Sequence, residues 1–249
     1  MKNFMLKVAL AVSALVVCLA PNAHADTATM DLTGAGSNVY GGVYIGPYQA
    51  TITPNGSSTG TPTPVICDDF GDESYVPEIW TANVSNEANV ASNSSILRFG
   101  GTSGYVSLYN EASWLAVNLM QNVGNNAEED AIQAAIWNIL DPTGVATNTY
   151  GFTLPGGSTC TNSVTQAACW QQWAQAAEGG TTAGMFSNVT IYSYVAGTPC
   201  IGASCPADPP QEFMVVNTPE PSTLLMLALG IGGLLMLWRR QRNVAVIAA

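Results

Sequence analysis

The chain has 249 residues, of which only 9% are charged, and its formal net charge at pH 7 is −11. Between residues 26 and 218 the only basic residue is Arg98, and this region has neither lysine nor histidine. A nucleic-acid partner is excluded, because phosphate binding needs several Lys or Arg contacts. A Ser-His-Asp or Cys-His catalytic site is excluded for lack of histidine, and a zinc site would have only cysteine and carboxylate ligands. We therefore predict no cofactor and no metal.

Residues 1–25 have the features of a secretory signal peptide. Two lysines precede the apolar run Val8–Leu19, and Ala23-His24-Ala25 matches a small-x-small cleavage site. We predict cleavage before Asp26. The apolar run is too short for a transmembrane anchor. The following region, 26–218, has a suitable length for one exported domain with a sizeable core.

Five cysteines remain after the signal peptide, and an exported chain favours disulfides. The natural local pairs are Cys160 with Cys169 and Cys200 with Cys205, each of which closes a short loop. Cys67 is the cysteine left over. It is a buried free thiol, half of an intermolecular disulfide, or a residue with a chemical role.

Strands are predicted on both sides of a helical region. Residues 31–53 alternate turn glycines with Val, Tyr and Ile, which predicts strands with a bend at Gly46-Pro47. A loop rich in Gly, Ser, Thr and Pro follows at 54–64. Further strands are predicted at Val65–Cys67, where the chain enters an acidic turn, and at Ile79–Val84, Val189–Val195 and Glu212–Val216.

The helical region is predicted at 109–178. Apolar residues at helical spacing predict a first helix from Tyr109 to near Gly124. Residues 143–162 are expected to form a loop, and Ser163–Glu178 a third helix ending at Gly179. Strands, a helical insert and further strands favour an α+β fold.

The best-marked helix is Ala131–Leu140. Ile132, Ile136 and Leu140 give it one buried face, and Asp141-Pro142 ends it, because the residue before proline leaves the helical conformation. Its predicted N-cap is Asn125 or Asn126; with Asn126, Glu129 would occupy the capping-box position. The first two helices are expected to form an antiparallel hairpin.

Three groups of residues compete as a functional site. Asp68, Asp69, Asp72 and Glu73 could ligate calcium, but they lack the spacing of a twelve-residue EF-hand loop, and a solvated acidic turn is the simpler interpretation. A carboxylate pair could hydrolyse glycosides, although the sequence selects no particular pair. The third group joins the unpaired Cys67 to Gln133 on the best-marked helix.

A cysteine thiol held against a glutamine carboxamide can expel ammonia and form an internal thioester. Trp137 lies one helical turn from Gln133 and could shield such a bond from water. An amine or hydroxyl that reached the thioester would be joined covalently to Gln133, and Cys67 would be released. The absence of lysine fits this chemistry, because the domain has no ammonium group of its own to consume the bond.

Ile66-Cys67-Asp68 and Ile132-Gln133-Ala134-Ala135-Ile136-Trp137 resemble the two motifs of bacterial thioester domains, found in surface adhesins. The similarity extends over roughly residues 39–195. It implies a β-barrel or sandwich-like part with an inserted helical subdomain, and a Cys67–Gln133 thioester between them with Asp68 and Trp137 in its surroundings. It also implies covalent attachment rather than enzymatic turnover.

The end of the chain, 219–249, resembles a PEP-CTERM sorting signal of Gram-negative bacteria. It comprises Pro219-Glu220-Pro221, an uncharged apolar helix predicted at 222–238, and an arginine cluster. The three arginines that would stop translocation are Arg239, Arg240 and Arg242. The resemblance implies recognition by an exosortase, with inner-membrane anchoring before processing and a final location at the cell surface or in the extracellular matrix.

The sequence therefore predicts an exported, non-enzymatic protein that attaches covalently to an amine or hydroxyl on a surface or matrix target. The first alternative is a structural or glycan-binding matrix protein with the same fold and no thioester. The second is a glycan-active enzyme.

Overall fold

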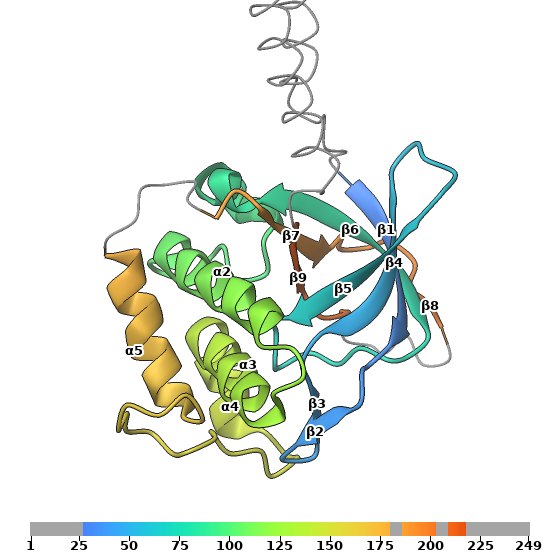
Figure 1. Cartoon of the computed structure of the whole chain (residues 1–249). Coiled ribbons are helices and arrows are strands. Elements are labelled where there is room, and N and C mark those ends of the chain that lie inside the picture. Colours follow the sequence, from blue (N-terminus) through green and yellow to red (C-terminus); the bar gives the residue numbers. More distant parts are fainter. Residues whose placement is uncertain (1–26, 180–185, 203–208, 218–249) are drawn as a thin grey trace, which may run out of the picture.

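Six strands with inward-facing apolar residues form a closed β-barrel in the computed structural model, which describes residues 27–179, 186–202 and 209–217 (Figure 1). Around the barrel the order is β1-β4-β5-β9-β7-β6, and every neighbouring pair is antiparallel. The strands are β1 (Thr27–Gly34), β4 (Tyr48–Pro54), β5 (Thr61–Cys67), β6 (Glu78–Asn86), β7 (Val189–Tyr194) and β9 (Phe213–Val216).

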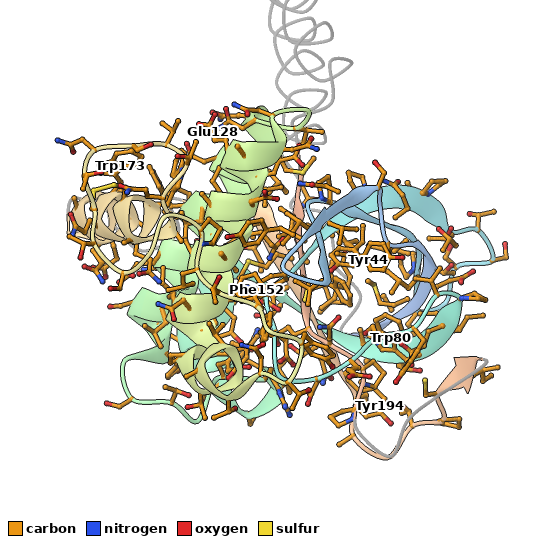
Figure 2. The ribbon with its side chains drawn as sticks, turned by 90° about the horizontal axis from the view of Figure 1, so that it is seen from below. Tyr44, Trp80, Glu128, Phe152, Trp173 and Tyr194 are labelled. Atoms are coloured by element: carbon orange, nitrogen blue, oxygen red, sulfur yellow. A yellow bond between two sulfur atoms is a disulfide. The ribbon has the colours of Figure 1, made fainter. Side chains whose placement is uncertain are left out.

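Barrel closure depends on β1, which pairs with β4 on one edge and with β6 on the other. Alternate residues of β1 point inward, and Ala28, Met30 and Leu32 are buried. Trp80 fills the interior against Phe213, and Figure 2 shows side chains occupying the barrel's cross-section. The short strand β8 (Ile201–Gly202) pairs with the first two residues of β6, and β2 (Asn38–Tyr40) pairs with β3 (Val43–Ile45) in a separate hairpin.

A helical subdomain is inserted between β6 and β7 and packs against one side of the barrel (Figure 1). In this subdomain α2, α3 and α5 pack against one another. Its elements are the 3-10 helices η1 (Glu87–Ser92) and η2 (Ser94–Ile96) and the α-helices α2 (Tyr105–Gln121), α3 (Asn126–Leu140), α4 (Pro142–Thr147) and α5 (Ala167–Glu178). The α+β fold, with a barrel and helices, is therefore confirmed.

The N-terminus of α3 differs from the predicted capping box. Asn125 is the N-cap residue, but its side chain accepts no capping hydrogen bond. Glu129 instead reaches back to the backbone N–H of Gly124 at 2.5 Å and is almost fully buried. It also accepts a hydrogen bond from Asn38, the first residue of β2. Glu129 therefore ties the helix to the β2–β3 hairpin.

Two predicted loops contain regular structure. Within 143–162, Pro142 ends α3 but also starts α4, because Asp141 accepts a hydrogen bond from the backbone of Gly144 at 2.9 Å and proline suits a first helical turn. Within 54–64, β5 begins at Thr61 despite Pro62 and Pro64. Both prolines lie before β5 meets β9, so the donors they lack are not needed for that pairing.

No helix among residues 27–179, 186–202 and 209–217 is long and apolar enough to cross a membrane. The predicted signal peptide and the predicted transmembrane helix at 222–238 lie outside these residues, as does the sorting motif.

Candidate functional site

The structure brings Cys67 and Gln133 together where the barrel meets the helices. Cys67 is the last residue of β5, and Gln133 projects from the second turn of α3. The Gln133 Nε2 donates a hydrogen bond to the Cys67 carbonyl oxygen at 2.5 Å, and neither residue is exposed to solvent. The Cys67 thiol donates to the backbone carbonyl of Asp69 at 3.0 Å. The Gln133 carboxamide thus contacts the backbone of the residue that bears the strand-end thiol.

Several polar atoms at this site are buried without a hydrogen-bond partner among the described residues, and two of them lie on α3. One is the Gln133 side-chain oxygen, an acceptor, and the other is the indole nitrogen of Trp137, a donor. They lie four residues apart on α3, and therefore on neighbouring parts of one helix face. Buried polar groups are nearly always paired, so an unused acceptor and an unused donor on the same helix face need an explanation.

Three aromatic rings pack against one another near the pair. Phe70 lies 4.9 Å from Trp137, and Phe152 lies 5.0 Å from Phe70 and 5.6 Å from Trp137, measured between ring centroids. All three side chains are buried. Figure 2 places Phe152 between the helices and the barrel. This Phe70–Trp137–Phe152 cluster forms a buried aromatic group close to Cys67, which is itself fully buried.

The electrostatics of the site disfavour a free thiolate. Burial raises the pKa of the Cys67 thiol well above its ordinary value, and the nearby carboxylates of Asp69 and Asp68 raise it further. Interaction with the Trp137 side chain opposes this effect but does not outweigh burial. The free thiol is therefore neutral at pH 7.

Asp68 belongs to a buried acidic cluster that the sequence interpretation missed. Its pKa is raised well above the ordinary value, first by burial and then by the charge of Glu212. Glu212 accepts hydrogen bonds from the Tyr109 hydroxyl at 2.5 Å, from the Arg98 backbone N–H at 2.9 Å and from the Ser193 hydroxyl. These donors favour a charged Glu212, so Asp68 is the member of the pair that keeps its proton.

The acidic turn after β5 is not simply solvated. Asp69 and Asp72 pair with Arg98 at 3.2 and 2.6 Å, and Asp69 is almost fully buried. Glu73, which is exposed, accepts hydrogen bonds from Tyr75 and Tyr150. The solvated-turn interpretation is therefore wrong for Asp68 and Asp69. Asp69 and Asp72 are paired with Arg98, and Asp68 belongs to the cluster around Glu212.

Of the predicted disulfides, Cys160 is bonded to Cys169, which ties the loop before α5 to that helix. Cys200 is also disulfide-bonded, and its predicted partner Cys205 lies outside the described residues. Among the described cysteines, Cys67 is the free one.

Comparison with known proteins identifies one part of the chain. Residues 217–241 match the PEP-CTERM protein-sorting motif. The match indicates that the protein is exported, that an exosortase sorts it, and that its C-terminal tail anchors it in the membrane before processing. No curated protein and no solved structure matches the chain.

Proposed function

We propose that this exported protein attaches covalently to a surface or matrix target through a thioester between Cys67 and Gln133. The observation that carries the proposal is the buried contact between an unpaired thiol-bearing residue and the side chain of a helix-borne glutamine. Attachment happens once per molecule, so the protein is not an enzyme. Asp68, whose raised pKa keeps it neutral, and Trp137 form the surroundings of the bond.

Bond formation needs no other reactant. The Cys67 sulfur adds to the side-chain carbonyl carbon of Gln133, and the carbonyl oxygen becomes an oxyanion. The carbon–nitrogen bond then breaks, and ammonia leaves with the proton of the thiol. Holding the two groups together in a buried site provides the entropic part of the acceleration.

Trp137 supplies the stabilising donor. Its indole N–H and the Gln133 oxygen are both buried and unpaired among the described residues. Charge develops on that oxygen during formation and opening of the bond, and a donor fixed in a dry site stabilises it. The unused donor and acceptor thus have a role in the transition state that they lack in the resting fold.

The same surroundings protect the bond from hydrolysis. The aromatic cluster excludes water, and the raised pKa of the Cys67 thiol makes its thiolate a poorer leaving group. An amine or hydroxyl of the target that reached the carbonyl carbon would form an amide or ester with Gln133, and the sulfur would take up a proton. The domain's lack of lysine avoids self-reaction.

Mass spectrometry of the exported protein tests the proposal. The intact mass should be about 17 Da below the sequence value, corrected for signal cleavage and disulfides, because ammonia is lost. Methylamine should open the bond, adding its mass to Gln133 and making Cys67 reactive to alkylating reagents. Cys67→Ala and Gln133→Ala should each abolish methylamine uptake. Full alkylation of Cys67 without methylamine, with no mass deficit, would rule the bond out.

The runner-up is a structural or glycan-binding matrix protein of the same fold without the bond. It is favoured by the hydrogen bond from the Cys67 thiol to the Asp69 carbonyl, since a satisfied thiol needs no further partner. Under this alternative, Cys67→Ala would leave target binding unchanged. In both cases we place the protein at the cell surface or in the extracellular matrix of a Gram-negative bacterium.

A further inference from the structure

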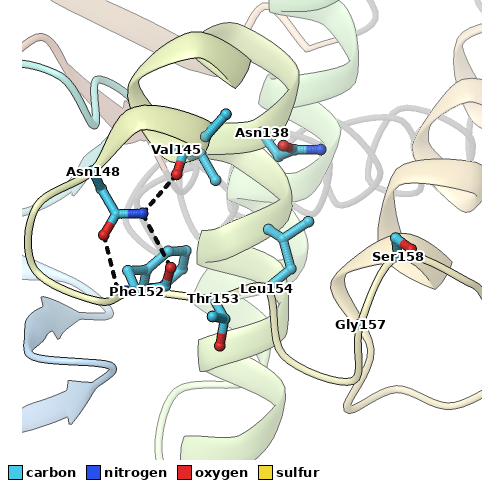
Figure 3. Close-up of a pocket in the computed structure, with 9 residues that line it drawn as sticks. Asn138, Val145, Asn148, Phe152, Thr153, Leu154, Gly157 and Ser158 are labelled. Atoms are coloured by element: carbon cyan, nitrogen blue, oxygen red, sulfur yellow. Dashed lines mark hydrogen bonds between the residues drawn. The ribbon is translucent and has the colours of Figure 1, made fainter.

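A cavity of about 420 Å³ lies beside the aromatic cluster (Figure 3). It is formed by the end of α3, by α4 and by the chain segment that follows α4. We call it the Asn148 pocket, and its lining includes Asn138, Val145, Asn148, Phe152, Thr153 and Ser158. Phe152 both lines this pocket and belongs to the Phe70–Trp137–Phe152 cluster.

The pocket is also close to the proposed bond along α3. Asn138 follows Gln133 by five residues, which at 1.5 Å per residue is about 7.5 Å along the helix axis. Trp137, between them, contacts Phe152. Phe152 therefore connects the pocket lining to Trp137, which lies one helical turn from Gln133.

Phe152 is held in a way that permits movement. It lies in the connection between α4 and α5, outside any helix or strand. Its backbone N–H donates to Asn148 Oδ1 at 2.9 Å, and its carbonyl accepts from Asn148 Nδ2 at 3.0 Å (Figure 3). Asn148 Nδ2 also donates to the Val145 carbonyl at 2.6 Å. One pocket-lining carboxamide thus fastens the segment, and displacing Phe152 breaks no hydrogen bond of a helix or strand.

The lining chemistry indicates the class of ligand. No charged side chain lines the pocket. Within the described part of the chain, the side chains of Asn138, Thr153 and Ser158 have no hydrogen-bond partner, so they can bind a ligand. Carboxamides and hydroxyls can both donate hydrogen bonds to hydroxyl groups and accept hydrogen bonds from them, whereas a protonated amine would favour a carboxylate. Phe152, Val145 and Leu154 add apolar surface.

We propose that the Asn148 pocket binds a neutral, hydroxyl-rich glycan and that Phe152 is the gate through which a glycan hydroxyl reaches the thioester. This inference rests on the proposed function and specifies its target. The hydroxyl oxygen bonds to the Gln133 carbonyl carbon, the carbon–sulfur bond breaks, and the hydroxyl proton passes to the Cys67 sulfur. The product is an ester, with Cys67 as a free thiol.

The gate can be tested without the bond. In the full chain carrying Gln133→Ala, Cys67 is a thiol, and its alkylation by iodoacetamide reports access. Adding Phe152→Ala should raise the alkylation rate at least tenfold, and Phe152→Leu should have a smaller effect. Tyr150→Ala removes an exposed ring from the same segment and is the matched control. Equal rates for Phe152→Ala and Tyr150→Ala, with circular dichroism showing folded proteins, would overturn the gate.

The ligand class is tested on the unsubstituted chain with cellotetraose, maltotetraose and Nα-acetyl-lysine as probes. At least one neutral tetrasaccharide should form an adduct at a rate that saturates with its concentration. Asn138→Ala should raise the half-saturating concentration of the tetrasaccharide about tenfold. If methylamine opens the bond but neither tetrasaccharide shows saturation, or only the lysine derivative does, the glycan assignment is wrong. A chain inert to methylamine in every variant would instead overturn the thioester, and this inference with it.

Discussion

At the scale of single residues, the Cys67–Gln133 site contains buried polar atoms that have no hydrogen-bond partner among the described residues. The Trp137 indole N–H and the Gln133 oxygen are buried together without partners among the described residues. An unpaired buried polar group costs about 1–3 kcal/mol. The fold carries this cost next to the thiol, at the point where the proposed reaction develops negative charge.

Replacing Trp137 with phenylalanine separates shielding from charge stabilisation. An aromatic ring, smaller than the indole, is kept and the N–H donor is lost, so opening of the thioester by methylamine should slow by about 100-fold, as for other single donors of this kind. The free energy of unfolding should also fall, because the smaller ring leaves a cavity at a buried position. Trp173→Phe on α5 is the control. A Trp137→Phe rate equal to that of the control would show that the indole only shields the site.

Gly41 permits the close packing of Phe152. Its φ is +58°, and a Cβ there would lie 3.0 Å from the Phe152 ring and 3.3 Å from the Phe152 Cα. Gly56 has a φ of +82° with nothing within 4 Å, so it tests backbone strain alone. Gly41→Ala should lower the free energy of unfolding by about 1 kcal/mol more than Gly56→Ala in urea denaturation. Equal effects would mean that the Phe152 segment moves aside without cost.

The sequence predicted Cys67, Gln133 and Trp137 as neighbours because two of them share a helix face and the third is an unpaired cysteine at a strand end. It did not predict the Asp68–Glu212 cluster. These residues are 144 positions apart, and only the pairing of β5 with β9 brings them together. An acidic residue beside another acidic residue usually indicates a solvated turn, and no local pattern marks the buried exception.

At the scale of elements, the connection between α4 and α5 carries both Phe152 and the pocket. Its second half is fixed by the disulfide between Cys160 and Cys169. Sequence patterns described this connection only as a loop, because polar and glycine-rich segments have no period. They located α2, α3 and α5, whose buried faces repeat at helical spacing, and misplaced their ends by up to four residues.

Removing that disulfide should loosen the connection. The double variant Cys160→Ser, Cys169→Ser should lose about 2–3 kcal/mol of unfolding free energy in the chain-entropy description of a short loop. Chemical denaturation measures the loss. The Phe152 gate should open more often, which raises Cys67 alkylation in the Gln133→Ala background. If stability falls while alkylation stays constant, the disulfide supports α5 and not the gate.

At the scale of the whole molecule, buried carboxyl groups dominate the dependence of stability on pH. Burial raises the pKa of Asp68, Asp69, Glu78, Glu87, Glu111, Asp130 and Glu212. A carboxyl whose pKa is higher in the folded state stabilises the fold below its unfolded pKa. That contribution is lost as the pH rises through the folded value. The protein should therefore be more stable at pH 5 than at pH 8.

Glu111 makes the best single test, because burial, followed by the charge of Glu178, raises its pKa from 4.5 to about 7. The loss between these values is about 1 kcal/mol after solvent screening. Glu111→Gln should therefore stabilise the protein at pH 8 and not at pH 4 in urea denaturation. Ser107→Ala on α2 is the comparison, because it removes a hydroxyl that donates to Glu178 on α5 and changes no charge. Equal gains at both pH values would assign the effect to packing.

The strand order also sets when the fold can be completed during export. The ring closes only when β9 enters between β5 and β7, and β9 is the last described strand before the sorting motif. Phe213, the first residue of β9, pairs with Cys67 on β5. In a chain threaded from its N-terminus, every other part of the domain crosses the membrane earlier. Translocation of residues 213–216 is thus the event that allows the thiol and the carboxamide to be enclosed together, immediately before the anchoring tail reaches the membrane.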